Sequence, residues 1–305
     1  MELNIDSQNR ELKLHGTYGF PVYVGRKLIS VYPTGFFPWH WHDEVEFTLV
    51  VSGKMEYRVN ERQYLLFTGQ GLFCNSEALH YGCMADEDCD YISITFHPRM
   101  LAGFEGSVLG SKYIYPAKEG GLPSSLLLLP EDEWKSEVLE SLREVYRLCS
   151  EKEPLYEIYV HIIFLKIWAS LYAQTVCCAQ IESSEDPEKL ERLRKILSYI
   201  HGHYAEKLSL DHIAKEVGLC KSECCRFFKR QMGESPFDYL LGYRIGRSLA
   251  FLQDGLTVSQ AAAAVGFTDA SYFSKVFRSR TGRSPSEYRK EAWGRVNRPG
   301  EEDKV

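Results

Sequence analysis

Hydrophobic and polar residues are spaced differently in the two halves of this chain. Between residues 16 and 98, short runs rich in Val, Tyr, Phe and Ile are separated by Gly, Pro and Asn. This pattern is typical of β-strands joined by turns. The expected strands are 19–24, 27–32, 46–52, 54–60, 63–67, 72–74 and 91–96. Many short strands at even spacing indicate an all-β sandwich or a small barrel.

Two helices are expected after the barrel. Apolar residues recur near a helical period in 134–149 and again in 155–175. The polar run 182–187 then breaks this pattern and indicates a linker. We therefore expect a barrel at 1–130, a helical segment at 131–180, a linker at 181–187 and a second domain at 188–295.

The second domain is predicted to be all-helical and contains a repeat. Gly218 recurs as Gly266 at an offset of 48 residues, and Phe228 recurs as Phe277 at an offset of 49. Each copy holds a short helix, a turn with Gly and a second helix, which together describe a helix-turn-helix. The expected helices are 210–217 and 220–231 in the first copy, 258–265 and 269–280 in the second, and a connecting helix at 236–253.

The second helix of each copy has one polar face and one apolar face. On the polar face, residues at i, i+3, i+4 and i+7 are short polar side chains followed by cations. Such a stripe suits the DNA major groove, where Ser and Arg reach base edges and Lys or Arg meets phosphates. A solvated helix face is the alternative, and two matching copies favour DNA binding. The residues of the two stripes are Ser222, Cys225, Arg226 and Lys229, then Ser271, Ser274, Lys275 and Arg278. Lys221, at the start of the first of these helices, is a further expected DNA-binding residue.

Composition excludes several classes of protein. The 305 residues are 44% hydrophobic and 26% charged, which is ordinary for a globular protein. No apolar run reaches the roughly 18 residues of a membrane span, and residues 1–10 lack the apolar core of a signal peptide. We therefore expect a cytoplasmic protein with no membrane partner and with its nine cysteines reduced.

Charge is divided unevenly along the chain, whose net charge is −6. Residues 1–185 carry 15 Lys and Arg against 26 Asp and Glu, a net charge of −11. Residues 186–305 carry 21 against 16, a net charge of +5. A basic domain joined to an acidic one indicates separate partners.

The second domain resembles a known family. Residues 190–290 are similar to the DNA-binding domain of the AraC/XylS family of bacterial transcription regulators, in the runs 208–219, 226–229, 243–245, 265–278 and 284–289. The resemblance implies that double-stranded DNA is a partner. It places the base-reading positions at Ser222, Cys225, Arg226, Ala270, Ser271, Ser274 and Lys275.

The first base-reading helix departs from the family pattern at Cys220, Glu223, Cys224 and Cys225. Glu223 stands three residues after the expected cap, where a carboxylate bonds backbone amides. Cys224 belongs to the apolar face, where a free cysteine packs as a small apolar residue. A thiol or metal sensor is the less favoured alternative for these cysteines.

The barrel carries the spacing His40-x-His42-x3-Glu46, followed later by His80. This spacing resembles the two cupin motifs, although the Pro-x-Gly that usually precedes the last histidine is missing. The resemblance implies a metal set of three histidines and one glutamate, which suits Fe, Mn, Ni or Zn. We expect no cofactor, and a divalent metal at His40, His42, Glu46 and His80 is the alternative. Structural hydrogen bonding in the barrel is a third interpretation.

A small-molecule pocket is the favoured interpretation of the barrel. Small barrels can hold one ligand, and aromatic walls with imidazole and carboxylate anchors suit a sugar. The expected effector-binding residues are Trp39, His40, His42, Glu46, Tyr57 and His80.

The predicted fold is therefore a cupin-like all-β barrel with trailing α-helices, then an all-α domain of two helix-turn-helix units joined by a long helix. The predicted function is ligand-responsive, sequence-specific transcription regulation without catalysis. By resemblance, we expect an activator that works with RNA polymerase and a homodimer joined through 131–180. The alternative is a metal-dependent cupin enzyme, or a metal sensor, fused to a DNA-binding domain.

Overall fold

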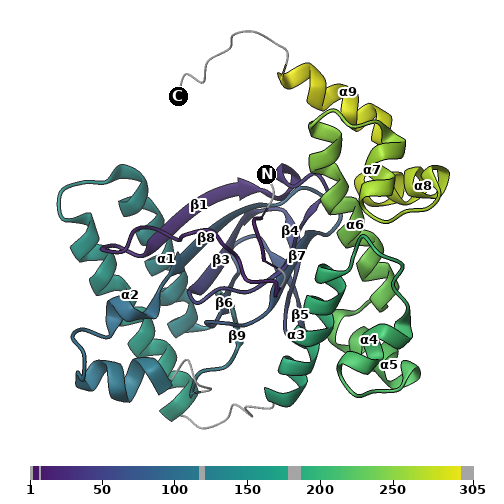
Figure 1. Cartoon of the computed structure of the whole chain (residues 1–305). Helices are drawn as coiled ribbons and strands as arrows, with labels where there is room; N and C mark the ends of the chain where they lie inside the picture. The colour runs from purple at the N-terminus through teal and green to yellow at the C-terminus, as the bar shows by residue number, and fades with distance from the viewer. Residues whose placement is uncertain (1–2, 7, 117–120, 178–186, 297–305) are drawn as a thin grey trace. The chain divides into compact units, whose positions relative to one another are not determined.

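The computed structural model of the chain describes residues 3–6, 8–116, 121–177 and 187–296 (Figure 1). The chain divides into two compact units, Met1–Pro187 and Glu188–Val305. Residues 181–186 of the expected linker lie outside the described residues. In the described part of the chain, no helix combines the length and the apolar character needed to cross a membrane.

The first unit contains two antiparallel sheets, as Figure 1 shows. The larger sheet has the order β1-β8-β3-β6-β9, and the smaller sheet has the order β2-β7-β4-β5. The strands are β1 (Val22–Leu28), β2 (Phe36–His40), β3 (Val45–Ser52), β4 (Lys54–Val59), β5 (Arg62–Phe67), β6 (Gly71–Cys74), β7 (His80–Met84), β8 (Asp90–Phe96) and β9 (Ser125–Leu128).

Strand β3 is buried on both faces because the larger sheet is covered on both sides. Its side chains alternate between those faces. Val45, Phe47 and Leu49 belong to the apolar cluster formed with the helices that follow the barrel. Glu46 and Thr48 have the opposite parity and face the space between the two sheets, where both are buried. A carboxylate is thereby placed inside the barrel.

Two helices, α1 (Glu133–Glu151) and α2 (Tyr156–Tyr172), cover the larger sheet. In Figure 1 they lie against its strands. The Phe164 ring of α2 stacks on Phe96 of β8 with 4.2 Å between ring centroids. Helix α2 is apolar almost all round, so packing one side against the sheet leaves other apolar side chains exposed. The exposed ones are Leu155, Ile158, Tyr159 and Ile162.

The predicted all-β barrel with trailing helices is confirmed, with differences in its strands. Parts of the expected strands 19–24 and 27–32 form one strand, β1, because Gly25 is extended and does not make a turn. The second expected strand is wrong at Ile29–Val31, which form a 3-10 helix. Strands β2, β7 and β9 were not among the expected strands. Their sequences contain Pro, Gly or only four residues, and pairing with neighbours determines their conformation. The turn after β4 uses Asn60 at a φ of 50°, as its asparagine favours.

The second unit is all-helical and follows the predicted helix-turn-helix pattern. Ser209 and Thr257 cap the first helix of each copy through bonds to the amides of His212 and Gln260. Ser235 caps the connecting helix. The helices are α3 (Pro187–Gly202), α4 (Leu210–Glu216), α5 (Lys221–Met232), α6 (Pro236–Gln253), α7 (Val258–Ala264), α8 (Ala270–Thr281) and α9 (Pro285–Val296).

A buried arginine ties the α3–α4 connection to α6. Arg244 donates hydrogen bonds to the carbonyl oxygens of Tyr204 and Glu206, at 2.7 and 2.8 Å. Tyr204 also packs against the apolar cluster of the second helix-turn-helix. The α3–α4 connection therefore packs on the second helix-turn-helix. The two helix-turn-helix units are joined by this contact as well as by α6.

Candidate DNA interface and effector site

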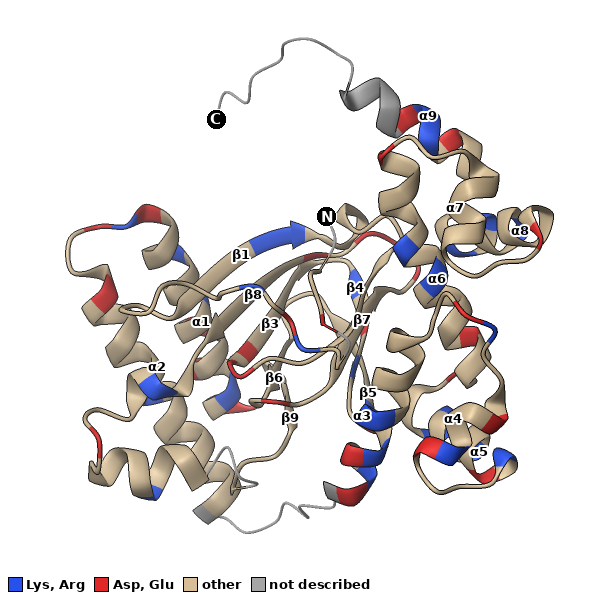
Figure 2. Ribbon diagram, viewed as in Figure 1, with Lys and Arg blue, Asp and Glu red and all other residues tan. Residues whose placement is uncertain are grey.

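Helices α5 and α8 each expose the predicted polar stripe. Their apolar sides are buried, with Cys224, Phe227 and Phe228 inward on α5, and Phe273 and Phe277 inward on α8. This burial fixes which side of each helix faces outward. Figure 2 shows Lys and Arg on both helices. Of the predicted DNA-binding residues, the exposed ones are Lys221, Ser222, Arg226, Lys229, Ser271, Lys275 and Arg278, and the half-buried ones are Cys225, Ala270 and Ser274.

Local bonds orient the start of each of these helices. The Glu223 carboxylate accepts a hydrogen bond from the Cys220 amide at 3.1 Å, as a capping role requires. The Lys221 ammonium pairs with Asp211 at 2.7 Å. In α8, Asp269 accepts hydrogen bonds from two backbone amides of the first turn. These caps leave the N-terminal turns with satisfied amides and stable exposed faces.

The cysteines of α5 differ in environment. Cys224 is buried in the helix-turn-helix core, where burial raises the pKa of its thiol to about 11. The thiolate is the reactive form of cysteine. Cys224 therefore packs as an apolar residue, in keeping with its place on the apolar face.

Three histidines meet inside the first unit, between the two sheets. His40 of β2 and His80 of β7 are direct cross-strand partners, and their ring centroids lie 4.1 Å apart. His42 follows β2 and lies 5.0 Å from the His80 ring. All three side chains are buried, at 4% exposure or less. The predicted grouping of these histidines is therefore present in the structure.

Hydrogen bonds orient each of the three imidazole rings. The Nδ1 atoms of His40, His42 and His80 lie 2.8, 3.1 and 2.9 Å from backbone carbonyl oxygens. Each Nδ1–H donates to its carbonyl, which leaves a lone pair on Nε2. Burial lowers the pKa of His40 and, more strongly, that of His80.

Glu46 places a buried carboxylate beside this group. Its Oε1 accepts hydrogen bonds from the Tyr57 hydroxyl at 3.1 Å and from the Thr48 hydroxyl at 3.2 Å. Its Oε2 lies 3.6 Å from His42 Nε2. Burial raises the pKa of Glu46, but the neighbouring His42 and the other histidines outweigh it and lower the pKa.

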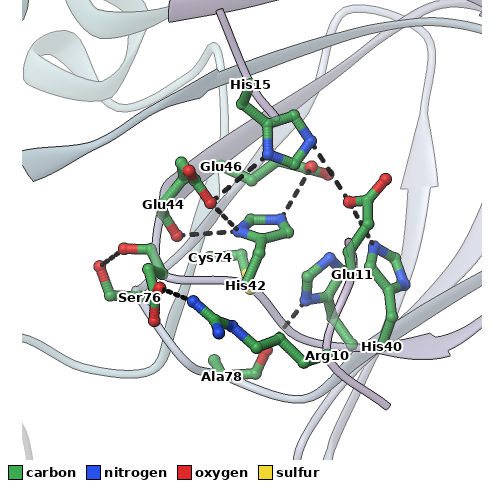
Figure 3. Close-up of polar contacts among 12 residues, drawn as sticks. Arg10, Glu11, His15, His40, His42, Glu44, Glu46, Cys74, Ser76 and Ala78 are labelled. Atoms are coloured by element: carbon green, nitrogen blue, oxygen red, sulfur yellow. Dashed lines mark hydrogen bonds and ion pairs between the residues drawn. The ribbon is translucent and has the colours of Figure 1, made fainter. Parts of the chain in front are cut away.

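The N-terminal segment adds residues that the sequence did not indicate. His15 lies between Glu11 and Glu44, with ring nitrogen to oxygen distances of 3.3 and 3.4 Å. Burial would lower the pKa of His15, but the two carboxylates outweigh it and raise the pKa to about 9. Figure 3 shows His15 facing His42, with Glu44 and Glu11 on its two sides. The spacing of Glu11 and His15 fits no motif, so no pattern placed them here.

Backbone pairing holds this segment against the barrel. The amide of Glu11 donates to the Trp41 carbonyl, and the amide of Trp41 donates to the Asn9 carbonyl, both at 2.9 Å. The Trp41 indole donates to the Gln8 carbonyl at 2.8 Å. Arg10 forms an ion pair with Asp43. Residues 8–15 therefore cover the histidines.

The cavity beside the histidines is small. It has a volume of about 30 Å³, whereas sites for drug-sized ligands are of the order of 300–1,000 Å³. His40 and Glu46 line it, together with Glu11 and His15. The other predicted effector-binding residues do not line this cavity; they are Trp39, His42, Tyr57 and His80. Tyr57 is buried against Glu46, and the Trp39 ring stacks on Tyr81.

Comparison with known proteins agrees with this arrangement. A family model described as an AraC-like ligand binding domain matches residues 28–158, and one described as a helix-turn-helix domain matches residues 213–291. The uncharacterized HTH-type transcriptional regulator YdeC of Bacillus subtilis is 34% identical over 94% of this chain and 97% of its own length. The chain belongs to the AraC family of transcriptional regulators.

Two more distant relatives of this AraC-family chain carry informative names. The HTH-type transcriptional activator RhaS of Escherichia fergusonii is 25% identical over 91% of this chain and 96% of its own length. The arabinose operon regulatory protein of Escherichia coli is 32% identical over 38% of this chain and 41% of its own length. Relatives and matched domains are those of regulators. The AraC-family chain is a regulator and not the cupin enzyme of the alternative prediction.

Proposed function

We propose that this AraC-family regulator is a homodimeric transcriptional activator that reads double-stranded DNA through α5 and α8 and responds to a small molecule. The observation that supports DNA reading is the pair of equivalent exposed stripes on these helices. Arg226 of α5 and Lys275 of α8 occupy equivalent places in the repeat, and both are exposed. Short Ser side chains beside them leave room for a base edge.

A sugar is the effector class that we propose to test first. The arabinose operon regulatory protein is a relative with a sugar operon in its name, and imidazoles and carboxylates can hydrogen-bond sugar hydroxyls. A cavity of about 30 Å³ holds no sugar. Sugar binding at the histidines therefore requires residues 8–15 to move away from them, and such a movement is a change that an effector can select.

Activation is the proposed sign of regulation. The relative RhaS is named an activator. An activator raises transcription by favouring RNA polymerase at the promoter, so contact with RNA polymerase is part of the proposal. The effector then changes DNA binding because it binds two states of the chain with different affinity, and these states also differ in their affinity for DNA.

The homodimer is proposed to form through α2. Leu155, Ile158, Tyr159 and Ile162 follow the i, i+3, i+4, i+7 spacing of one helix face and are 43–58% exposed. Exposed apolar faces of this kind mark interaction sites. A second copy of the chain presents the same apolar face, and a two-fold axis pairs it with itself.

Selection from random duplexes tests the DNA-reading proposal. The full chain is used to select bound sequences, and its Kd for the selected site is then compared with that for shuffled DNA at fixed salt. We expect specific binding at least 1,000-fold tighter than non-specific binding. Replacing Arg226 and Lys275 by Ala should abolish this preference. A Lys195→Ala variant removes a charge from α3, outside both stripes, and should retain it.

The effector part is read separately. Tm is measured with a panel of monosaccharides, and a sugar that raises Tm should also change the Kd for the selected DNA. If no sequence is enriched, the DNA-reading proposal is contradicted. Enrichment with no response to any sugar contradicts only the sugar assignment.

A further inference from the structure

We propose that the first unit binds a small zwitterion with an apolar side chain, an amino acid or a short peptide, in a cavity beside α2. The cavity has a volume of about 530 Å³, within the range of about 300–1,000 Å³ that is typical of small-molecule sites. Among the described residues, none lines both this cavity and the one beside the histidines. The proposed ligand therefore binds apart from the sugar and the DNA of the proposed function.

Three segments form the walls of this cavity: residues 18–21 before β1, residues that follow β8, and the first turns of α2. The Phe20 ring meets the ring of Tyr156, the first residue of α2, edge to face with 5.7 Å between ring centroids. Phe20 and Met100 both pack against the apolar cluster that joins the larger sheet to α1 and α2. The walls are therefore anchored to the core, and the cavity is present before any ligand binds.

Arg99 supplies a positive charge to the cavity wall. Its Nη2 donates a hydrogen bond to the Tyr18 carbonyl oxygen at 3.2 Å, and its Cζ lies 4.5 Å from the centroid of the Tyr18 ring. These two contacts orient the guanidinium. A guanidinium has five N–H donors, so the bond to Tyr18 leaves others for a ligand. Arginine binds a carboxylate through two parallel N–H bonds, which makes a carboxylate the group expected here.

Helix α2 supplies a negative charge to the same cavity. Glu157 and His161 are four residues apart, so they lie on one face of α2, and both line the cavity. In the part of the chain that the structure describes, Arg99 and Glu157 form no ion pair with each other or with another side chain. A carboxylate with no cation of the chain beside it attracts the ammonium group of a ligand. Opposite charges on two elements thus match the two charges of a zwitterion.

Apolar side chains make up much of the remaining wall. Phe20, Met100, Ile158 and Ile162 line the cavity. Ile158 and Ile162 are 56% and 43% exposed, so an apolar group that covers them removes hydrophobic surface from water. A sugar or an inorganic ion would leave this surface uncovered. An amino acid and a short peptide share the two charges and the apolar side chain, and the experiment below distinguishes them.

Ile158 and Ile162 also belong to the α2 face of the proposed dimer. A second copy of the chain is therefore the competing occupant of the cavity. A ligand that binds beside this face should change the dimer Kd, because dimerisation and ligand binding then share part of one surface. Ligand binding is accordingly measured at protein concentrations below and above the dimer Kd.

Isothermal titration calorimetry of the full chain with L-leucine and with L-leucyl-L-leucine tests the site. We expect one ligand per chain, and the probe that binds more tightly identifies the ligand as an amino acid or a peptide. Arg99→Gln and Glu157→Gln should each weaken binding by about tenfold or more, which corresponds to about 1.4 kcal/mol or more. Lys166→Gln on α2 and Glu137→Gln on α1 are the matched controls. They remove the same charges at exposed positions outside the cavity, and both should bind like the wild type.

Two derivatives of the tighter probe test each charge contact directly. The C-terminal amide lacks the carboxylate and the N-acetyl derivative lacks the ammonium group, so each should bind the wild type about tenfold or more weakly than the zwitterion. Arg99→Gln should not weaken binding of the amide further, and Glu157→Gln should not weaken binding of the N-acetyl derivative further. This pattern is a coupling between one side chain and one ligand group. A variant that merely folds less well would weaken all three ligands alike.

Four outcomes overturn the proposal. Neither probe binds the wild type, or the zwitterion binds no more tightly than its amide and N-acetyl derivatives. The Arg99 and Glu157 variants bind as tightly as the wild type. Binding is lost at protein concentrations where the chain dimerises, because a second copy then fills the cavity. Failure of DNA selection or of the sugar panel would contradict the proposed function and leave this site intact.

Discussion

At the scale of single residues, Arg226 and Lys229 lie one helical turn apart on the exposed face of α5. Their positions predict different effects on DNA binding. Arg226→Ala should cost about 1–3 kcal/mol and relax specificity at one base pair, because a guanidinium that reads a base discriminates against the others. Lys229→Ala should weaken binding to all sequences equally and reduce the salt slope by about one. Titration of matched and mismatched duplexes at several salt concentrations measures both effects.

The control for this pair is Lys195→Ala, whose exposed ammonium lies on α3 within an ion pair to Glu191. It should leave both the specificity and the salt slope unchanged. If Arg226→Ala weakens all duplexes by the same factor, Arg226 contacts phosphate and reads no base.

His201 predicts a pH dependence of stability. It is buried in the second unit, 2.7 Å from the Tyr239 hydroxyl and stacked on Tyr243. Burial, and then the charge of Arg247, lower its pKa to about 3. In the unfolded chain this histidine has a pKa near 6.5, so at acidic pH it binds a proton that His201 does not bind in the folded unit. The contribution of neutral His201 to the free energy of unfolding should therefore be fully present above pH 6.5. At pH 5 the free energy of unfolding should be about 2 kcal/mol lower because of this group.

Urea unfolding of the full chain at pH 7.5 and pH 5.0 measures this effect. His201→Gln should lose less stability over that interval than the wild type, by about 2 kcal/mol. Equal losses in both proteins would show that His201 is protonated in the folded unit or contributes nothing to the titration.

At the scale of elements, the two helix-turn-helix turns provide a matched pair of glycines. Gly218 and Gly266 both end the first helix of their copy, at φ values of 65° and 82°. A Cβ at Gly218 would meet nothing within 4 Å, whereas one at Gly266 would lie 2.6 Å from the Ala205 carbonyl oxygen. Gly218→Ala should therefore cost about 1–2 kcal/mol for the left-handed backbone. Gly266→Ala should cost about 3 kcal/mol or more, because overpacking adds to that strain.

Urea denaturation of the two variants tests this difference. A smaller loss at Gly266 than at Gly218 would mean that residues 203–208 move away easily. The contacts of Arg244 with Tyr204 and Glu206 would then contribute little to the stability of the second unit.

The helices were more predictable than the strands because their signals are local. Ser209, Thr257 and Ser235 mark helix starts, and Gly218 and Gly266 mark helix ends, all within a few residues of the apolar period. The bounds of α4 to α8 therefore agree with prediction to within one residue. Strands β2 and β7 depend on distant partners, and β7 in particular has Gly82 packed against the Phe37 ring, so their own sequences carry little signal.

The candidate sites divide in the same way. The spacing of His40, His42 and Glu46 within one short segment predicted that they lie together. The resemblance to the second cupin motif added His80. The neighbours Glu11 and His15 reach the cluster through two isolated bridges, Ile5 with Glu11 and Arg10 with Trp41. Such bridges leave no periodic pattern in a sequence. The structure therefore brings the predicted histidines together and adds a covering segment that the sequence did not indicate.

At the scale of the whole molecule, each unit has its own apolar core and its own type of chemistry. The first unit buries histidines and carboxylates between its sheets, and the second exposes short polar and basic side chains on two equivalent helices. A molecule organised in this way can bind DNA and respond to a small molecule through separate parts. The proposed dimer would bring two such helix-turn-helix domains together, and α2 offers an exposed apolar face for it.

The dimer proposal predicts a change in mass on substitution at α2. Ile158→Asp with Ile162→Asp places charges on an apolar face that is 56% and 43% exposed at these residues. In a two-fold interface each change occurs twice, so the dimer Kd should rise by at least about 100-fold, or about 2.7 kcal/mol. Sedimentation equilibrium measures the mass. Leu65→Asp, at a 47% exposed site on β5, is the control and should remain dimeric. A variant pair that stays dimeric, or a wild type that is monomeric at micromolar concentration, would place the contact elsewhere or remove it.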